Sequence, residues 1–352
     1  MPGNRSVGHL VKQEDSTRQN LPSSRDSDRA YPSVSVSIVN HSSRDLLRAC
    51  LESLRHYPYT FGEMEVVVLD NASTDGSVEM LENDFADVVV LAERERRGFG
   101  ANQNRAVRTC RGDLVFIFNP DAVVHEHTID RLVSALAWDE RVAVAGGPIV
   151  NADHTFRQDR PHPFPTPFSP LAKAFGLQRL WARRRIGQAV IDDGWPSGGA
   201  CLIERRAFVE VGGFDEDFFM YSEDVDLFAR LVAQGRLVAW VDDAIVTHPY
   251  RDEPAPLAAR REAEIVHAEL QYMRKHFGRV WVYRIGVIID AALRLATLST
   301  PWTSRFVNQH GKSVSYNLQA QRARLAAAIS RQQRPGLRDL AREWNNHRPP
   351  GH

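Results

Sequence analysis

The alternation of short apolar segments with amphipathic ones is the feature that most restricts the fold of this chain. Met64–Leu69 is almost entirely apolar, as expected of a strand covered on both faces in a parallel sheet. A helical pattern at Arg44–His56 precedes it. Further strand patterns occur at Val34–Val39, Val88–Ala92, Leu114–Phe118 and Val142–Gly147, with helical patterns between them. This order predicts an α/β fold that binds its ligands at the carboxyl ends of the strands.

Polar residues follow two of these strands where each one ends. Asp70-Asn71-Ala72-Ser73-Thr74-Asp75-Gly76-Ser77 comes after Met64–Leu69, and Asn119-Pro120-Asp121 comes after Leu114–Phe118. These residues could bind a ligand, but Asp, Asn and Ser are also common in ordinary strand-to-helix turns. An Asn-Pro turn could likewise cap a helix near Thr128. From the residues alone, both interpretations stay open.

A glycine-containing segment, Arg97 to Asn104, opens a helix after the third strand. With Asp121 about twenty residues further on, it resembles a dinucleotide-binding pattern. However, Gln103 stands where that pattern requires its third glycine, and the segment does not form the first strand-to-helix turn. A nicotinamide-dependent oxidoreductase is therefore the less favoured alternative.

The stretch from Trp195 to Leu231 combines an aromatic residue, a Ser-Gly-Gly run, a short apolar strand and a cluster of acidic residues. Its acidic residues lie between Asp215 and Asp226, a span of twelve positions that also invites comparison with a calcium-binding loop. That loop needs glycine where Met220 stands and glutamate at its last position, so a calcium loop is rejected.

A helix is expected to begin after Ser222, because Ser is a good N-cap and apolar residues then recur at helical spacing. On a helical wheel Asp224 lies at the border of the apolar stripe, whereas Glu223 and Asp226 fall on the opposite, more polar side. Half-apolar surroundings raise the basicity of a carboxylate, which suits a general base. Acidic residues are also favoured in the first turn of any helix, so the helix dipole alone could explain them.

The string GGFDEDFFMYSEDVDL, from Gly212 to Leu227, resembles the acceptor-side signature of inverting GT-A glycosyltransferases of family two, especially the rhamnosyltransferase-like branch. The resemblance covers roughly Val34 to Tyr250. It implies a GT-A fold, which is a Rossmann-like, mostly parallel central sheet flanked by helices, here with a C-terminal helical extension. It also implies that Asp224 is the catalytic base.

The same resemblance implies a donor site and a metal site. Asn119-Pro120-Asp121 is similar to the family's metal-binding motif, in a form that leaves Asp121 as the one sure carboxylate ligand of Mg²⁺ or Mn²⁺. His248, just after a predicted strand at Ala244–Thr247, would complete the metal site, although a lone His is more often structural. The donor-binding residues implied are Asn40, Asp70, Gly98, Asn104, Asn119 and Asp121. The acceptor or sugar-pocket residues implied are Trp195, Gly198, Gly199 and Glu223.

Composition and pattern divide the chain into four regions. Residues 1–32 are predicted to be a disordered tail, 33–253 the catalytic domain, 254–300 a helical extension and 301–352 a basic tail. Residues 151–193 are proline-rich, with a basic group at Arg183–Arg185, and are expected to form a lid or an acceptor-binding loop. The extension should contain a helix at Leu257–His276. Val280–Leu298 carries too many charges to span a membrane, so it would lie at a membrane surface or pack on the domain.

Charge and cysteine content restrict the partners and the compartment. The 44 basic and 44 acidic residues balance, which gives no indication of nucleic-acid binding. The thiols of Cys50, Cys110 and Cys201 form no metal pattern and suggest a reducing compartment. The first thirty residues lack the apolar segment of a secretion signal, so we expect a cytoplasmic protein, peripheral on the inner face of the membrane.

We therefore expect a metal-dependent, inverting glycosyltransferase. Its donor would be a nucleotide-diphosphate sugar, with dTDP-rhamnose or a UDP-sugar favoured by the resemblance. Its acceptor would be a hydroxyl of a glycan or lipid-linked molecule in cell-surface polysaccharide synthesis. A non-catalytic relative that only binds nucleotide or glycan is the remaining alternative.

Overall fold

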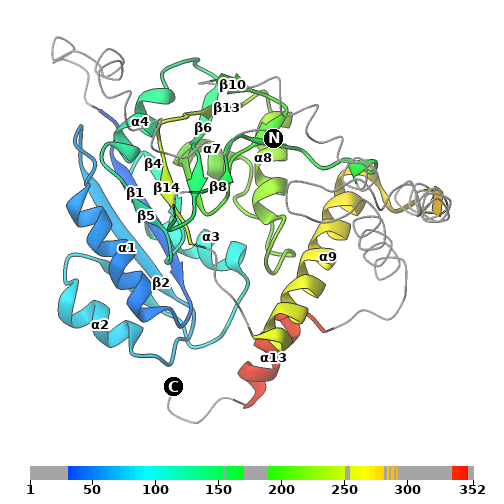
Figure 1. The fold of residues 1–352 in the computed structure, drawn as a ribbon, viewed down its shortest axis with the longest axis horizontal. Coiled ribbons are helices and arrows are strands. Elements are labelled where there is room, and N and C mark those ends of the chain that lie inside the picture. Colours follow the sequence, from blue (N-terminus) through cyan, green and yellow to red (C-terminus); the bar gives the residue numbers. More distant parts are fainter. Residues whose placement is uncertain are drawn as a thin grey trace.

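An eight-stranded sheet forms the centre of the molecule, with strand order β10-β13-β6-β12-β4-β1-β2-β3 (Figure 1). The computed structural model describes residues 31–153, 155–169, 189–249, 254–280 and 335–347, with single positions between 284 and 291. The strands of this sheet are β1 (Val34–Asn40), β2 (Met64–Asp70), β3 (Val89–Ala92), β4 (Leu114–Phe118), β6 (Val142–Gly146), β10 (Ala189–Ile191), β12 (Ala200–Glu204) and β13 (Leu237–Trp240).

Most neighbouring strands of the sheet run parallel. β1 pairs in parallel with β2 and β4, β2 with β3, and β6 with β13. β12 runs antiparallel between β4 and β6, and β10 runs antiparallel at the edge. The predicted α/β fold with a mostly parallel sheet is confirmed. The carboxyl ends of β1, β2 and β4 consequently meet at one edge, which carries the polar turns predicted from the sequence.

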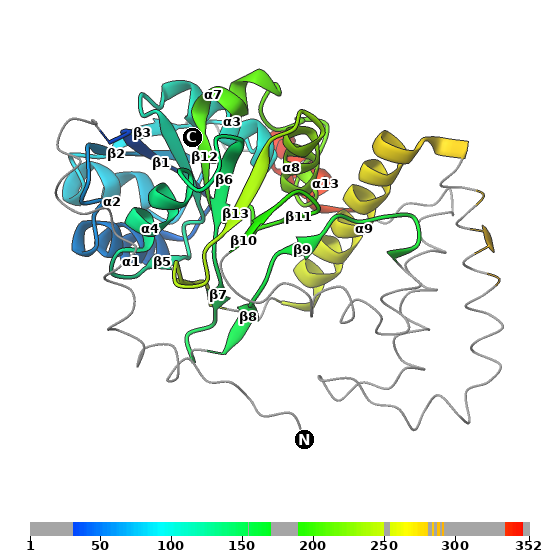
Figure 2. The same cartoon turned by 90° about the horizontal axis from the view of Figure 1, so that it is seen from above.

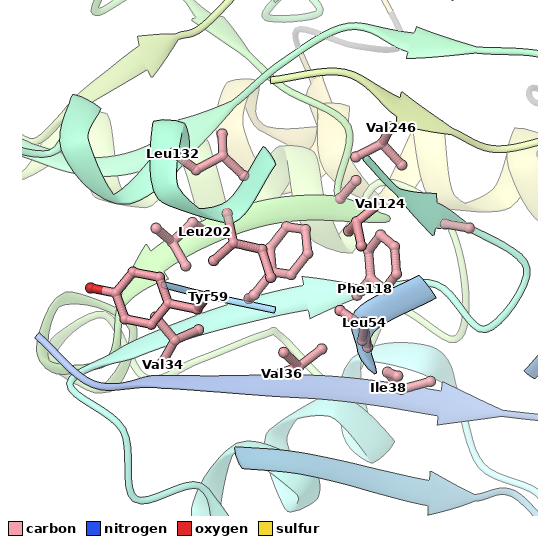
Figure 3. Packing of buried hydrophobic residues seen from close by; sticks show 14 of the residues in the cluster. Val34, Val36, Ile38, Leu54, Tyr59, Phe118, Val124, Leu132, Leu202 and Val246 are labelled. Atoms are coloured by element: carbon pink, nitrogen blue, oxygen red, sulfur yellow. The ribbon is translucent and has the colours of Figure 1, made fainter. Parts of the chain in front are cut away.

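Helices cover both faces of the sheet and bury alternate residues of each strand. Those on one face are α1 (Arg44–His56), α2 (Ser77–Asp84) and α4 (Thr128–Ala135), and those on the other are α3 (Phe99–Thr109), α7 (Arg205–Glu210) and α8 (Glu223–Ala233). Figure 3 shows the first face, where Val34, Val36 and Ile38 of β1 pack beside Leu54 and Phe118. Their spacing of two follows from the alternation of side chains along a strand.

Gln103, which breaks the dinucleotide pattern, has a structural role under the second face of the sheet. Its side chain is fully buried, and its Oε1 accepts a hydrogen bond of 2.6 Å from the hydroxyl of Ser37 on β1. A polar residue is thus needed at this position because β1 places a buried hydroxyl opposite it. Glycine could not provide that partner.

Short strands bring distant parts of the chain to the site. β5 (Val123–Val124), β14 (Val246–Thr247), β7 (Ile149–Val150) and β8 (Phe156–Gln158) form a small sheet, and β9 (His162–Pro163) pairs with β11 (Gly194–Trp195). The described part of the predicted loop at 151–193 therefore contains strands β8, β9 and β10 and is not wholly irregular. Residues 170–188, including Arg183–Arg185, lie outside the described residues, so the predicted lid stays a prediction.

Of the two C-terminal helices, α9 (Ala255–Phe277) packs beside α8, and α13 (Leu337–His347) packs against α9 (Figures 1 and 2). α9 confirms the predicted helix and is slightly longer at both ends. α13 lies within the region predicted as a basic tail at 301–352, and the sequence analysis did not predict this helix. Its residues Leu337, Leu340, Ala341 and Trp344 follow a helical spacing too short to stand out in the sequence. In the described part of the chain, no helix has both the length and the apolar character needed to cross a membrane.

Candidate active site

Asn40 and Asp70 stand opposite each other at the carboxyl ends of β1 and β2, in register. Both are buried, and Asn40 Nδ2 donates a hydrogen bond of 2.8 Å to Asp70 Oδ2. The backbone N–H of Ser73 donates to the other carboxylate oxygen at 2.9 Å. Asn40 Oδ1 is buried and has no hydrogen-bond partner among the described residues. Because buried acceptors are normally satisfied, this oxygen is available for a donor group of a ligand.

Gly98 and Asn104, two further predicted donor-binding residues, contact the loop that precedes α8. A Cβ on Gly98 would lie 2.4 Å from the carbonyl oxygen of Phe219, which accepts a hydrogen bond of 2.8 Å from the N–H of Phe99. The Asn104 amide donates to Phe214 O at 2.9 Å and accepts from Phe214 N at 2.8 Å. Both residues therefore join α3 to the loop before α8, and their binding of a donor stays a prediction.

Three polar side chains meet just beyond the end of β4, those of Asn119, Asp121 and His248. His248 Nε2 lies 3.2 Å from Asp121 Oδ1 and 3.0 Å from Asn119 Nδ2. The N–H of His248, just after β14, donates to Val150 O of β7 at 2.8 Å, so β7 fixes its backbone. The structure thus brings together residues that are far apart in the sequence and that were predicted as one site.

The pair formed by Asp121 and His248 fits a divalent cation in the type and number of its ligand atoms. One carboxylate and one imidazole can bind Mg²⁺ or Mn²⁺, which usually keeps several water or phosphate oxygens as ligands. No group of three or more His, Cys, Asp or Glu residues that could hold a metal ion occurs among the described residues. A metal here would therefore need further oxygen ligands from its substrate or from water.

Asp224 lies in the first turn of α8, half-buried, with both carboxylate oxygens held by backbone N–H groups. Oδ1 accepts from Val225 N at 2.8 Å and Oδ2 from Gly198 N at 3.2 Å. Burial raises the pKa of Asp224, and the two hydrogen bonds partly oppose that rise. Ser222 precedes the helix as predicted, with φ of 61°, but its hydroxyl makes no capping hydrogen bond. The local geometry thus gives a carboxylate that is more basic than usual.

The helical wheel was wrong about Glu223 and Asp226, which do not face solvent. Glu223 is only 5% exposed, and Asp226 is 0% exposed. The wheel treats α8 as an isolated helix, whereas α9 and the loop before α8 cover the side where both acids lie. Burial and the neighbouring carboxylates of Asp224 and Glu264 raise the pKa of Glu223 well above its usual range. Glu223 Oε2 has no hydrogen-bond partner among the described residues.

Asp226 is buried, yet its pKa is lowered, which favours the charged carboxylate. Burial alone would raise its pKa, yet hydrogen bonds from His276 and Lys275 and the charge of Arg230 hold that pKa at about 2. Sequence analysis did not single out His276 or Lys275. They lie in the last turn of α9, some fifty residues from Asp226, and no local pattern indicates that pairing.

Gly198 and Gly199 lie between Asp224 and the cluster of Asn119, Asp121 and His248. A Cβ on Gly198 would lie 2.4 Å from Asp224 Cβ, and a Cβ on Gly199 would lie 2.4 Å from Asn119 Nδ2. The N–H of Asn119 also donates to Gly199 O at 2.9 Å. The family resemblance implies that these glycines belong to the acceptor or sugar pocket. In the structure, the space that their missing side chains leave is filled by Asp224 and Asn119.

Trp195, the predicted aromatic residue of the acceptor pocket, packs against both α8 and β9. Its ring lies 5.0 Å from the ring of His162 on β9, and it also contacts the cluster of Phe218 and Val225. Its Nε1 is buried and has no hydrogen-bond partner among the described residues. Sequence analysis missed His162, because strands of two residues leave no recognisable pattern.

The sequence matches the model of the family described as "Glycosyl transferase family 2" over residues 34–212. The N-acetylglucosaminyl-diphospho-decaprenol L-rhamnosyltransferase of Mycobacterium tuberculosis is 30% identical over 232 residues, which cover 58% of this chain and 74% of the relative. The rhamnosyltransferase WbbL of Escherichia coli is 26% identical over 223 residues, covering 57% of this chain and 78% of the relative.

The fold is also similar to that of a solved glycosyltransferase. The mannosyltransferase PcManGT of Pyrobaculum calidifontis, solved with GDP-Man and Mn²⁺, matches with a TM-score of 0.53 and 18% identity. The match covers 95% of this chain and 96% of that protein. The predicted GT-A fold, with its mostly parallel sheet and added C-terminal helices, is confirmed.

Proposed function

This chain belongs to glycosyl transferase family 2, and on that premise we propose that it moves a sugar from a nucleotide-diphosphate sugar to an acceptor hydroxyl, with inversion. The names of the two relatives favour a deoxysugar such as rhamnose, carried on dTDP, with a UDP-sugar as the next choice. The name of the mycobacterial relative supports a lipid-linked or glycan acceptor. The reaction would serve the synthesis of a cell-envelope polysaccharide.

The observation that carries this proposal is the position of two adjacent glycines between a base and a cation site. Gly198 contacts Asp224, and Gly199 contacts Asn119 of the cluster with Asp121 and His248. Transfer from a diphosphate sugar needs both groups close to one carbon atom. The base must reach the attacking hydroxyl on one side, and the positive charge must meet the leaving diphosphate on the other.

Asp224 would accept the proton of the acceptor hydroxyl as that oxygen attacks the anomeric carbon. The raised pKa of Asp224 makes its carboxylate a better proton acceptor than an exposed one. A divalent cation bound by Asp121 and His248 would neutralise the charge that develops on the leaving diphosphate. Asn40 and Asp70 would hold the nucleoside at the ends of β1 and β2. Because the hydroxyl attacks directly, from the face opposite the diphosphate, the configuration inverts.

Two structural observations distinguish the transferase from the alternative functions, a nicotinamide-dependent oxidoreductase and a non-catalytic relative. A nicotinamide-dependent enzyme needs a glycine where buried Gln103 bonds to Ser37. A non-catalytic relative has no need of a carboxylate with a raised pKa beside a metal-ligand pair, as Asp224 is here. Both observations favour the transferase.

A panel of nucleotide sugars, incubated with acceptor mixtures and either Mg²⁺ or Mn²⁺, tests the proposal. Release of nucleotide diphosphate that depends on the cation is the expected result. Nucleotide diphosphate with Mg²⁺ should also raise the melting temperature, whereas NAD should not. Stabilisation by NAD with no response to any nucleotide diphosphate would contradict the proposal.

We propose further that the protein associates with the inner face of the cytoplasmic membrane. Phe277 at the end of α9 is 36% exposed, and Val280, Val287 and Ile288 beyond it are 64%, 48% and 64% exposed. Exposed apolar side chains beside the arginines at 279 and 284 suit an interfacial segment, which gains from burial of apolar area and from anionic lipid.

A further inference from the structure

The last turn of α9 holds the first turn of α8 through a buried carboxylate. Asp226 accepts hydrogen bonds from His276 Nε2 at 2.8 Å and from Lys275 Nζ at 3.0 Å. Lys275 also bonds to Asp215 at 2.6 Å, in the loop before α8. The His276 ring stacks on Tyr272, with 4.4 Å between centroids, so the imidazole is fixed within its own helix.

This contact restricts the position of the proposed base. Asp226 lies in the same helical turn as Asp224, and its side chain is fully buried. The turn cannot shift unless the buried carboxylate loses its hydrogen bonds from Lys275 and His276, which is costly in a protein interior. α9 therefore determines where Asp224 stands relative to Gly198.

α13 holds a second loop, which lies on the donor side of the domain. The Asn345 side chain donates from Nδ2 to Arg96 O at 3.0 Å and accepts from Arg96 N at 2.9 Å. The Arg96 guanidinium also lies over the Trp344 ring, 4.1 Å from its centroid. The adjacent Arg97 backbone both donates to and accepts from the side chain of Asn71, which follows Asp70 in the polar turn after β2. The loop is thus fixed between this turn and α13.

The two helices are joined to each other and to the loop before α8. The N–H of Arg338 donates to Glu264 of α9 at 3.2 Å, and Glu343 pairs with Arg260 of α9 at 3.2 Å. The Arg338 guanidinium bonds to Asp217 O and lies over the ring of Phe219. In Figure 1 α13 lies at the lower end of α9, and in Figure 2 it appears between α8 and α9.

We infer that α9 and α13 together position two parts of the site for sugar transfer, and we call this pair of helices the clamp. The two parts are the base, Asp224, and the loop that contains Arg96 and Arg97, which we call the donor loop. His276 is the positioning residue for the base helix, and Asn345 is the positioning residue for the donor loop. The inference rests on the proposed function, and it gives the C-terminal extension a part in the reaction in addition to any part in membrane binding. A clamp of this kind matters because small misplacements of reacting groups slow an enzyme strongly.

The two positioning residues should change different kinetic constants of the full-length enzyme. His276→Ala should lower kcat about tenfold or more and leave KM for the donor within about twofold, because it moves the base and not the nucleotide site. Asn345→Ala should raise KM for the donor about fivefold or more and leave kcat within about twofold, because it frees the donor loop. His276→Gln should recover much of the loss, since its amide can still donate to Asp226.

Matched controls lie beside each residue. Arg274 and Asn346 are exposed neighbours on the same helices, and Arg274→Ala and Asn346→Ala should behave as wild type. If His276→Ala and Asn345→Ala instead change kcat and KM together, in proportion to their melting temperatures, the helices only stabilise the fold and the clamp is wrong.

A direct binding measurement separates failure of the clamp from failure of the proposed function. Binding of nucleotide diphosphate with Mg²⁺ should weaken in Asn345→Ala and stay unchanged in His276→Ala. If wild type binds the nucleotide diphosphate but transfers no sugar, the proposed function fails while this binding difference still tests the clamp. Equal binding by both variants and wild type would overturn the role of Asn345.

Discussion

Gly198 donates its backbone N–H to Asp224 across 26 positions of sequence, with the nitrogen 3.2 Å from Oδ2. The two residues are so close that a Cβ on Gly198 would lie 2.4 Å from Asp224 Cβ and 2.5 Å from Oδ2. The glycine therefore does more than permit a turn. It lets the β11–β12 connection touch the carboxylate and hold one of its oxygens.

Gly198→Ala should displace Asp224 and lower kcat about a hundredfold, because the methyl group occupies the place of the carboxylate. Binding of nucleotide diphosphate with Mg²⁺ should change little, since Asp70 lies at the end of β2 and Asp121 lies in the turn after β4. Gly235→Ala is the control. Gly235 has φ of +79° and nothing within 4 Å, so alanine there should cost stability by backbone strain without slowing turnover. Normal turnover by Gly198→Ala would show that this contact does not position the base.

Asp224→Asn should lower turnover at least about a hundredfold, the low end of what general base catalysis supplies. The amide keeps the shape of the carboxylate but cannot accept a proton. Donor affinity should be nearly unchanged. Because the base acts in its deprotonated form and its pKa is raised, the wild-type rate should begin to fall on acidification above the pH at which an ordinary Asp titrates. Turnover measured against pH, beside nucleotide binding, checks both points.

Glu223→Gln should be milder than Asp224→Asn. Burial and the neighbouring carboxylates raise the pKa of Glu223 well above its usual range, which favours the neutral form that the amide of Gln resembles. If Glu223→Gln is inactive while Asp224→Asn turns over normally, the wrong carboxylate has been assigned as the base.

The sequence predicted the sheet, and it placed several candidate residues at the carboxyl ends of its strands, because both depend on local patterns. Apolar runs located β1, β2 and β4 to within a residue or two, and the polar turns after them located Asp70 and Asp121. The family resemblance added His248, which the structure places 3.2 Å from Asp121. These signals are short-range or motif-based.

The sequence failed where burial depends on a distant partner. Asp226 looks solvent-facing on the wheel of α8 alone, yet His276 and Lys275 of α9 enclose it. α13 was missed for the same reason. Its helix is short, and much of what holds it in place is polar contact with Arg96, Arg260 and Glu264, which no periodicity of its own sequence encodes.

Asp121→Ala should abolish transfer and weaken binding of nucleotide diphosphate, because the diphosphate loses its counter-charge. His248→Ala should have the same effect in weaker form. Binding measured with Mg²⁺, with Mn²⁺ and with chelator checks the assignment and separates these variants from Asp224→Asn, which should still bind. Near-normal activity of Asp121→Ala in the presence of chelator would show that the metal site is wrongly assigned.

Asp226 should make the free energy of unfolding depend on pH in the acidic range. Its pKa is about 2 in the folded protein, below the ordinary value of 3.8, so its stabilisation is present above the unfolded pKa and is lost as pH falls towards 2. The shift corresponds to about 2 kcal/mol of unfolding free energy. Asp226→Asn should be less stable than wild type at neutral pH, and the two should converge towards pH 2. A stability difference that does not shrink in acid would show that the ion pairs contribute little.

Truncation after Arg279 tests the membrane proposal, because it removes the exposed apolar residues Val280, Val287 and Ile288 and everything beyond them. Full-length protein should float with liposomes that contain anionic lipid, and the truncated protein should not. High salt should release part of the full-length protein, since salt screens the attraction of arginine to the lipid but leaves apolar burial intact.

Because truncation also removes α13, the substitution Val287→Ser with Ile288→Ser is the matched variant. It keeps α13 and should still reduce flotation. Equal flotation of full-length, truncated and substituted protein would rule out this segment as the membrane contact.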